Sequence, residues 1–345
     1  MNLIAHALNN TYQIVINDKA HLSLDNYISS KNKLVVIIDD KVDESLFSSL
    51  LSKALVFKIT ASEKTKNLET VQNIFEFLFK NNITRNDTLI SIGGGVTSDI
   101  TGLAASLYKR GINWINIPTT LLAMVDASIG GKVGVNFSSF KNGVGAIKFP
   151  NIVIIDVTTL QTLSKREFNN GLCEALKMGL TLDKTILPLL DDQNNLELLI
   201  QKCIIAKDNI IQKDVYDFYA RHILNFGHTF GHALEMLSLN SNYPYLHGES
   251  ILLGMQFVSE PKMQKIIASY IAKWNIPYDF KFDKEEIKKI SVSTKNSSYK
   301  NDKKNIDNKV CLVYLNDYEN YEIKYISATD INSYITKGCG FHELK

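Results

Sequence analysis

Short apolar runs alternate with helical patterns over the first 156 residues of the chain. The runs are rich in valine and isoleucine, which is typical of strands buried on both faces of a sheet, and they occupy residues 33–39, 55–59, 88–92, 113–117 and 151–156. Between the second and third runs, apolar residues recur at helical spacing at Leu68, Val71, Ile74, Phe75, Leu78 and Phe79. This alternation predicts an α/β, Rossmann-like domain whose parallel sheet is covered by helices.

Beyond about residue 165 the pattern becomes mostly helical. Residues 196–213 and the segment around 225–235 have helical spacing, whereas 309–315 and 321–326 have the composition of a strand pair. Polar residues dominate 293–309, which we expect to form a mobile loop.

A chain of 345 residues is long enough for two domains with substantial cores. We expect an α/β domain at residues 1–165 and a mainly helical domain at 166–345, with a cleft between them. The chain is 45% hydrophobic and its net charge is only +2, a balance that argues against a nucleic-acid-binding protein.

The first residues lack the basic and then apolar pattern of a secretory signal, and no apolar run approaches the length of a membrane span. The cysteines, Cys173, Cys203, Cys311 and Cys339, are far apart and form no C-x-x-C pair. They are typical of reduced thiols, so we expect a cytoplasmic protein.

Three glycines, Gly93 to Gly95, separate the run at 88–92 from a helix start. Glycines at such a turn let the backbone approach a pyrophosphate at the positive end of a helix, although many turns use them for geometry alone. The segment does not match G-x-G-x-x-G because Ser98 occupies the last glycine position. Asp99 is a candidate contact for a nicotinamide or ribose. Asp39, at the end of an earlier run, is a candidate for the adenine ribose or else a helix cap.

His228 and His232 stand four apart in "NFGHTFGHALE", a stretch with helical spacing. Two imidazoles on one helical face can bind a divalent metal, but ordinary hydrogen-bonded histidines fit the spacing equally well. Thr229 follows His228 where the H-E-x-x-H peptidases have a glutamate base, so a peptidase is disfavoured. A metal site here requires further ligands and a different chemistry.

The stretch "IPTTLLAMVDASIGGKVGVN" (117–136), followed by "FKNGVGAIKFP" (140–150), predicts a tight loop that presents Asp126 and Lys132 to a ligand. Over these segments the sequence resembles the 3-dehydroquinate synthases. They are sugar-phosphate cyclases, which share a superfamily with iron-dependent alcohol and glycerol dehydrogenases. The resemblance runs from about Ala61 to Leu315.

The resemblance implies the dehydroquinate synthase-like fold, an N-terminal domain that binds NAD and a helical domain that binds metal and substrate. It also implies the reaction. 3-Deoxy-D-arabino-heptulosonate 7-phosphate becomes 3-dehydroquinate and phosphate, a step of the shikimate pathway, by transient oxidation, β-elimination, re-reduction and intramolecular aldol closure.

A catalytic zinc, for which Co²⁺ is a possible substitute, is implied by the same resemblance. Its ligands would be Glu174, His228 and His247, with positions left open for substrate hydroxyls. His232 would then bind no metal and would instead bind substrate and transfer protons.

The remaining site residues also follow from the resemblance. Those implied for NAD, together with Asp39, are Ala61, Ser62, Glu63, Lys64, Thr65, Lys66, Gly95, Val96, Thr97, Ser98, Asp99, Thr119, Thr120, Lys132, Lys141, Asn142, Thr159, Leu160, Gln161, Thr162 and Asn170. Those implied for substrate are Arg110, Asp126, Lys132, Lys177, Lys207, Arg221, Asn225, His232 and Lys304, the last favoured over Lys303. Those implied for catalysis are His232, Asp217, Lys132 and Asp126. Considered alone, each lysine would be interpreted as a solvated surface charge.

Four positions or segments depart from the family pattern. "ASEK" (61–64) stands where D-G-E is usual, and Ser98 replaces a common glycine, which suggests an altered phosphate loop. Asp217 replaces a glutamate four residues before Arg221, so its shorter side chain puts its reach in question. "GAIKFP" (145–150) lacks the usual aromatic and glutamine residues, with no clear consequence.

Arg110 lies at the predicted end of the helix that follows the glycines. Alone it would be a surface charge or a helix C-terminal cation. The resemblance implies a homodimer in which this arginine enters the neighbouring subunit's active site.

Three alternatives to a 3-dehydroquinate synthase remain. A sister cyclase that acts on a sedoheptulose phosphate needs fewer cations, whereas Lys207 and Arg221 favour a keto acid. A glycerol-type dehydrogenase usually holds its metal with aspartate and several histidines and releases NADH. A non-enzymatic binding protein is disfavoured because every implied ligand position is retained.

Overall fold

The computed structural model describes residues 1–6, 11–28, 31–138, 140–239, 241–277, 309–327 and 330–339. These residues form two compact units. Unit 1 comprises Met1–Phe168 and Asn194–Tyr216, and unit 2 comprises Asn169–Gln193 and Asp217–Lys345.

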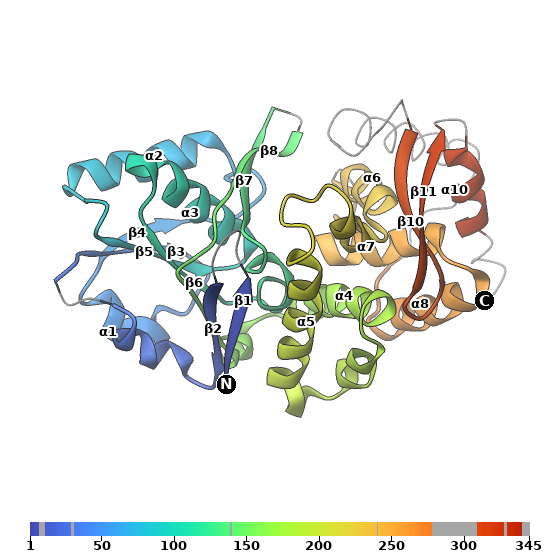
Figure 1. The fold of residues 1–345 in the computed structure, drawn as a ribbon, viewed down its shortest axis with the longest axis horizontal. Helices are drawn as coiled ribbons and strands as arrows, with labels where there is room; N and C mark the ends of the chain where they lie inside the picture. Colours follow the sequence, from blue (N-terminus) through green and yellow to red (C-terminus); the bar gives the residue numbers. More distant parts are fainter. Residues whose placement is uncertain are drawn as a thin grey trace. The chain divides into compact units, whose positions relative to one another are not determined.

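Unit 1 is built on a seven-stranded sheet of order β1-β2-β9-β6-β5-β3-β4 (Figure 1). Each of the five predicted runs forms a strand, in parallel pairing with its neighbours, which confirms the α/β prediction. These strands are β3 (Leu34–Asp39), β4 (Leu55–Ile59), β5 (Thr88–Gly93), β6 (Asn113–Pro118) and β9 (Ile152–Asp156). β1 (Asn2–His6) and β2 (Thr11–Asn17) were not predicted from the sequence; they pair antiparallel and extend the sheet beside β9.

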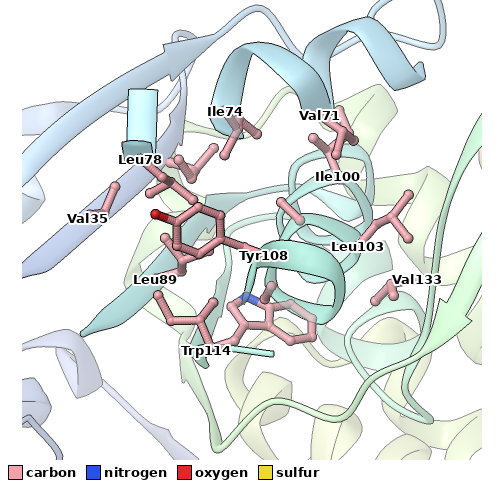
Figure 2. Close-up of a cluster of buried hydrophobic side chains, with 14 of the residues drawn as sticks. Val35, Val71, Ile74, Leu78, Leu89, Ile100, Leu103, Tyr108, Trp114 and Val133 are labelled. Carbon is pink, nitrogen blue, oxygen red and sulfur yellow. The ribbon is translucent and has the colours of Figure 1, made fainter. Parts of the chain in front are cut away.

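The sheet is buried on both faces because successive side chains of each strand point to opposite sides. In β3, Val35 and Ile37 join one apolar cluster, whereas Val36 and Ile38 join the other. The first cluster lies under α2 (Leu68–Lys80) and α3 (Gly95–Leu107), as Figure 2 shows.

The opposite cluster is covered by short helical segments. These segments are η1 (Ala20–Asn26), η2 (Glu44–Phe47) and α1 (Ser48–Leu51). The apolar spacing predicted between the second and third runs is therefore that of α2, whose Val71, Ile74 and Leu78 are buried against the sheet.

The segment after β6 is not the tight loop that we expected. Asp126 lies in a π-helical turn, η4 (Ala123–Ala127), and Lys132 is the first residue of β7 (Lys132–Phe137), which pairs with β8 (Phe140–Ile147). Met124 and Val125 are fully buried. A helical turn satisfies their backbone groups internally, which explains why this buried segment is helical and does not form the expected loop.

Helix α5 (Leu196–Ile211) groups with unit 1, although the expected division placed it in the second domain. Asp208 of α5 accepts hydrogen bonds from the backbone N and the Nδ1 of His6 in β1, at 2.9 and 2.7 Å. Contacts between residues this distant in sequence cannot be predicted from local patterns of apolar residues, so the grouping of α5 with unit 1 was not expected.

Four further helical segments are short. η3 (Tyr108–Arg110) and η5 (Val157–Thr162) belong to unit 1, η6 (Lys184–Asp191) belongs to unit 2, and η7 (Gln193–Asn195) lies where the chain returns from unit 2 to unit 1. Helix α4 (Lys165–Thr181) begins in unit 1, and its residues from Asn170 onward, which are all buried, belong to unit 2.

Unit 2 is mainly helical, as predicted. Its other helices are η8 (Ala220–Asn225), α6 (His228–Ser238), α7 (His247–Met255), η9 (Gln256–Val258), α8 (Pro261–Lys273) and α10 (Ile331–Cys339). The predicted strand pair forms β10 (Lys309–Asp317) and β11 (Asn320–Ser327), which pair antiparallel. α10 lies beside this hairpin (Figure 1), and the ring of Tyr334 on α10 is 6.0 Å from that of Tyr314 on β10.

Two expectations fall outside the described residues. Nearly all of the polar segment 293–309 lies there, and so do Lys303 and Lys304. Within the described part of the chain, no helix has the length and apolarity needed to span a membrane.

Candidate active site

Three side chains with metal-binding atoms converge in unit 2. They are Glu174 of α4 and the first residues of two helices, His228 of α6 and His247 of α7. One ligand atom from each lies within 4.8 Å of the others, and the Nε2 of His247 is 3.8 Å from the Oε1 of Glu174. The resemblance implied this set of three, and the fold brings it together.

Close packing of α6 against α7 places the two histidines side by side. Gly227, directly before α6, has φ +78°, and a Cβ on Gly254 of α7 would lie 2.2 Å from its carbonyl oxygen. Only glycine permits this approach of one backbone to another. As a result, the rings of His228 and His247 lie 5.3 Å apart.

The donor set fits a divalent metal. Glu174 is fully buried, and neither of its carboxylate oxygens accepts a hydrogen bond from the residues that the structure describes. Its neighbour is the Lys177 ammonium, one turn further along α4 and itself buried. A buried carboxylate needs positive charge beside it, and two imidazoles with one carboxylate form a set that catalytic zinc sites use.

The protonation of His228 suits the same role. Burial lowers the pKa of its imidazole well below the ordinary value, and the Lys177 ammonium lowers it further. The ring is therefore neutral near pH 7, which is the form that binds a metal.

His232 lies one turn beyond His228, on the same side of α6. Its ring is 5.3 Å from that of His228 and 5.8 Å from that of His247. Among the described residues, the metal-competent group consists of Glu174, His228 and His247 without it. His232 thus borders the three candidate ligands, where a proton-transfer residue is expected.

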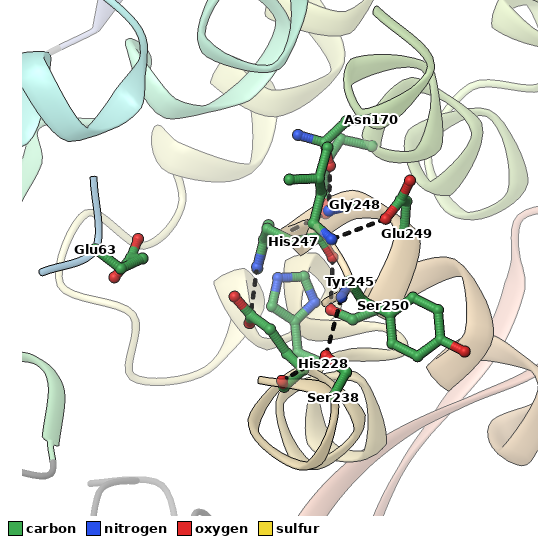
Figure 3. Close-up of polar contacts among 12 residues, drawn as sticks. Glu63, Asn170, His228, Ser238, Tyr245, His247, Gly248, Glu249 and Ser250 are labelled. Atoms are coloured by element: carbon green, nitrogen blue, oxygen red, sulfur yellow. Dashed lines mark hydrogen bonds and ion pairs between the residues drawn. The ribbon is translucent and has the colours of Figure 1, made fainter. Parts of the chain in front are cut away.

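The backbone that carries His247 is fixed on both sides. The Oε2 of Glu249 accepts a hydrogen bond from the N–H of Leu246 at 2.8 Å, and the Oδ1 of Asn170 accepts one from Gly248 at 2.6 Å (Figure 3). Asn170 was implied as an NAD contact, but it is buried and its amide oxygen holds the start of α7. Glu249 was missed, although a glutamate three residues after the N-cap is a known sequence signal.

Arg221 lies in η8 and is only 3% exposed. A solvated surface charge is therefore excluded for Arg221, and burial excludes it likewise for Lys66, Lys177 and Lys207. Asp217, which has a φ of +63°, lies three residues before η8, and Asn225 is the last residue of η8.

The implied nucleotide segments are in unit 1, around the end of β5 and the start of α3. Gly94 is the N-cap of α3, so the first turn of the helix offers unpaired N–H groups of the kind that bind phosphate. Gly95 to Asp99 form this turn. A Cβ on Gly94 would lie 3.2 Å from Thr120, so this glycine also permits close packing.

Asp99 and Asp39 have partners in the segment 61–66. The Nζ of Lys66 is 2.5 Å from the Oδ2 of Asp99. Burial raises the pKa of the Asp99 carboxyl, and the Lys66 ammonium opposes that rise. Asp39 accepts hydrogen bonds from the N–H groups of Lys41 and Ala61, whereas the N-cap of the next helical segment, η2, is Asp43.

Asn136 of β7, which the sequence analysis missed, connects several implied NAD segments. Its amide donates to Oε2 of Glu63 at 2.8 Å, and its backbone N–H donates to the carbonyl of Lys66 at 2.8 Å. Its Oδ1 accepts a hydrogen bond from the N–H of Asn142 at 2.9 Å. One side chain thus ties the segment 61–66 to the β7–β8 hairpin. Asn136 is the last residue of the stretch 117–136, but no role was implied for it there.

The other implied residues of unit 1 have the following positions. Thr119 and Thr120 follow β6, and Thr159 to Thr162 form the end of η5. Lys132, Lys141 and Arg110 are exposed. Arg110 and Lys109 both have positive φ in the tight bend that ends η3, where the Nζ of Lys109 donates to the carbonyl of Ile83.

Similarity to known proteins decides among the alternatives. Residues 56–170 match the 3-dehydroquinate synthase N-terminal family model, and residues 171–305 match the 3-dehydroquinate synthase C-terminal model. The 3-dehydroquinate synthase of Campylobacter concisus strain 13826 is 39% identical over 295 residues, which cover 80% of this chain and 83% of the relative. That of Clostridium tetani strain Massachusetts / E88 is 36% identical and covers 91% and 89%.

The chain belongs to the 3-dehydroquinate synthase family. Its enzymatic activity is that of this family, the formation of 3-dehydroquinate. The fold is shared more widely. A solved structure of ValA, the 2-epi-5-epi-valiolone synthase of Streptomyces hygroscopicus subsp. jinggangensis 5008 with NAD⁺ and Zn²⁺ bound, has a TM-score of 0.83 at 23% identity, covering 99% of this chain and 100% of that one.

One departure from the 3-dehydroquinate synthase pattern has a structural explanation. Ser98 is buried, and its hydroxyl donates to the Oδ1 of Asn116, which also accepts from Ser91. The serine that replaces the usual glycine therefore faces the sheet. Its hydroxyl is thus bonded within the core, and the expected alteration of the phosphate loop stays a prediction.

Proposed function

We propose that the chain converts 3-deoxy-D-arabino-heptulosonate 7-phosphate into 3-dehydroquinate and phosphate. The reaction would use one zinc ion, for which cobalt can substitute, and one NAD that is not consumed. The convergence of Glu174, His228 and His247 beside Lys177 and His232 is the observation that carries this proposal.

Glu174, His228 and His247 would hold the metal. When bound, it supplies Lewis acidity that lowers the pKa of substrate hydroxyls. The residues around the start of α3, the segment 61–66 and the β7–β8 hairpin would hold NAD. When bound, it supplies a hydride acceptor that returns the hydride before product leaves.

The protein's own side chains orient the substrate and balance its charge. The substrate has a carboxylate and a phosphate, and the cations assigned to these groups are held away from bulk water. Arg221 would bind the carboxylate through paired N–H groups, while Lys177 and Lys207 neutralise the remaining negative charge.

His232 would move a proton at a substrate hydroxyl, because it lies beside the metal ligands without joining them. Asp217 would assist it at the shorter reach of an aspartate. Asp126 and Lys132 complete the catalytic set, Lys132 also contacting NAD. Asn225 and Lys304 complete the substrate contacts.

We also propose a homodimer in which each subunit's Arg110 serves the site of its partner. The bend that ends η3 supports this role, because it exposes Arg110 on a rigidly held backbone.

The test supplies the purified protein with 3-deoxy-D-arabino-heptulosonate 7-phosphate, NAD and Zn²⁺. Phosphate and the carbocycle should accumulate in equal amounts without net NADH. Sedoheptulose 7-phosphate, which lacks the carboxylate, serves as the control substrate. Faster turnover of this control, or stoichiometric release of NADH, would overturn the proposal.

A further inference from the structure

A second buried carboxylate faces the candidate metal ligand His247. Glu235 lies on α6, nearly two turns beyond His228, and its side chain is 9% exposed. Its Oε2 is 3.7 Å from the Nδ1 of His247. The Nε2 of the same ring is 3.8 Å from Glu174. The imidazole therefore has one buried carboxylate at each nitrogen.

The two nitrogens must then have different roles. A neutral imidazole carries one proton, so a ring that offers the Nε2 lone pair to a metal carries its proton on Nδ1. Nδ1 is the nitrogen that lies 3.7 Å from the Oε2 of Glu235. A shift of less than about 1 Å brings the pair to the length of a charge-assisted hydrogen bond.

The other histidine ligand has the same arrangement. The Nδ1 of His228 lies 3.2 Å from the carbonyl oxygen of Phe226, which leaves its Nε2 for the metal. Each imidazole thus has an acceptor behind it. The acceptor is a neutral carbonyl for His228 and a carboxylate for His247.

Neighbouring hydrogen bonds tie the backbone of Glu235 to the segment that precedes α7. Ser238 Oγ donates to the carbonyl of Glu235 at 2.8 Å and accepts from the N–H of Tyr245 at 2.9 Å. The residues just before α7 are thereby tied to the end of α6. Glu235 and His247 are held at the two ends of this short connection.

We propose that Glu235 is a positioning residue that holds the Nδ1–H of His247, so that the Nε2 of the ring faces the metal and its basicity rises. The inference rests on the proposed metal site. A carboxylate behind a histidine ligand fixes the ring and its tautomer, and loss of such a partner commonly lowers metal affinity about 10–100-fold.

The test measures Zn²⁺ affinity by chelator competition, independently of turnover. Glu235→Ala should bind Zn²⁺ about 10–100-fold more weakly than the wild type. Glu235→Gln, whose amide oxygen still accepts from Nδ1–H, should recover most of the affinity. Met236→Ala is the matched control, because Met236 is the next residue of α6 and is 43% exposed.

Two further measurements separate positioning from a general structural role. The visible spectrum of the Co²⁺-loaded protein should change in Glu235→Ala and not in Met236→Ala, because only the former alters the ligand field. In a His247→Ala background, Glu235→Ala should add little to the loss of affinity, since the two residues act as one unit.

Equal Zn²⁺ affinity in wild type and Glu235→Ala would overturn the positioning role and leave the metal site intact. A full additional loss in the His247→Ala background would also overturn it. A wild-type protein that binds no Zn²⁺ would instead refute the proposed metal site itself.

Discussion

Lys207 contacts Asp126 twice: its ammonium lies 2.8 Å from the Oδ1 of the side chain and donates to the backbone carbonyl oxygen at 2.6 Å. Lys207 is 5% exposed, on α5, and Asp126 is in the π-helical turn after β6. Both residues were implied as substrate contacts from motifs far apart in the sequence. Because they are paired within unit 1, replacing one of them leaves the charge of the other without its counter-charge.

Lys207→Met should lower kcat/KM at least about tenfold, since it removes a charge-assisted contact worth about 1.5–3 kcal/mol. Lys207→Arg should retain part of the activity because the positive charge remains. Lys213→Met, just beyond the end of α5 and exposed, is the control. Steady-state kinetics on the three variants decides the matter. Similar kcat/KM values for Lys207→Met and Lys213→Met would show that the pair contributes nothing to catalysis.

Substitutions of the three metal ligands and of His232 should have different effects on metal content, although all four should lower turnover. Glu174→Ala, His228→Ala and His247→Ala should each be purified with much less metal and activity than the wild type, because a lost ligand weakens both affinity and Lewis acidity. His232→Ala should retain the metal and lose turnover. Elemental analysis of the four purified variants checks this. A His232→Ala protein devoid of metal would refute its assignment.

Asn136→Ala should weaken NAD binding about fivefold to thirtyfold. The side chain joins Glu63 to Asn142, and loss of such hydrogen bonds costs about 1–2 kcal/mol. Asn113→Ala is a suitable control, since its amide makes a 3.4 Å contact at the far end of β6. Calorimetric titration with NAD measures both. Unchanged affinity in Asn136→Ala would mean that these segments hold their positions without it.

The central strands could be predicted because their apolar runs are continuous. The side chains of β5, for example, are all buried, and such a strand needs no alternation. β1 has no such run, since Ala5 is buried while Ile4 is 69% exposed. An edge strand of this kind is recognised only through its partner.

Site residues could be predicted where a local sequence motif identifies them. Glu174, His228 and His247 were found through such motifs. Glu235 and Asn136 are the last residues of two such motifs but were not singled out, because the partners that they contact are brought close only by folding. Asn170 shows a second kind of gap, since the hydrogen bond from the N–H of Gly248 to its amide oxygen could not be anticipated from sequence, while its implied contact with NAD stays a prediction.

Arg110→Ala and Lys132→Ala test the proposed exchange of residues between subunits. Each homodimer should be poorly active, because every site lacks one cation. In a mixed dimer with exchange, one site combines an intact Lys132 from its own chain with an intact Arg110 from its partner, and the other site lacks both. Random mixing makes half of the dimers mixed, so about a quarter of wild-type activity should return. If both residues serve the same subunit's site, mixing restores nothing. Unfolding and refolding the two variants together, with wild-type protein carried through the same treatment as the control, distinguishes the two arrangements.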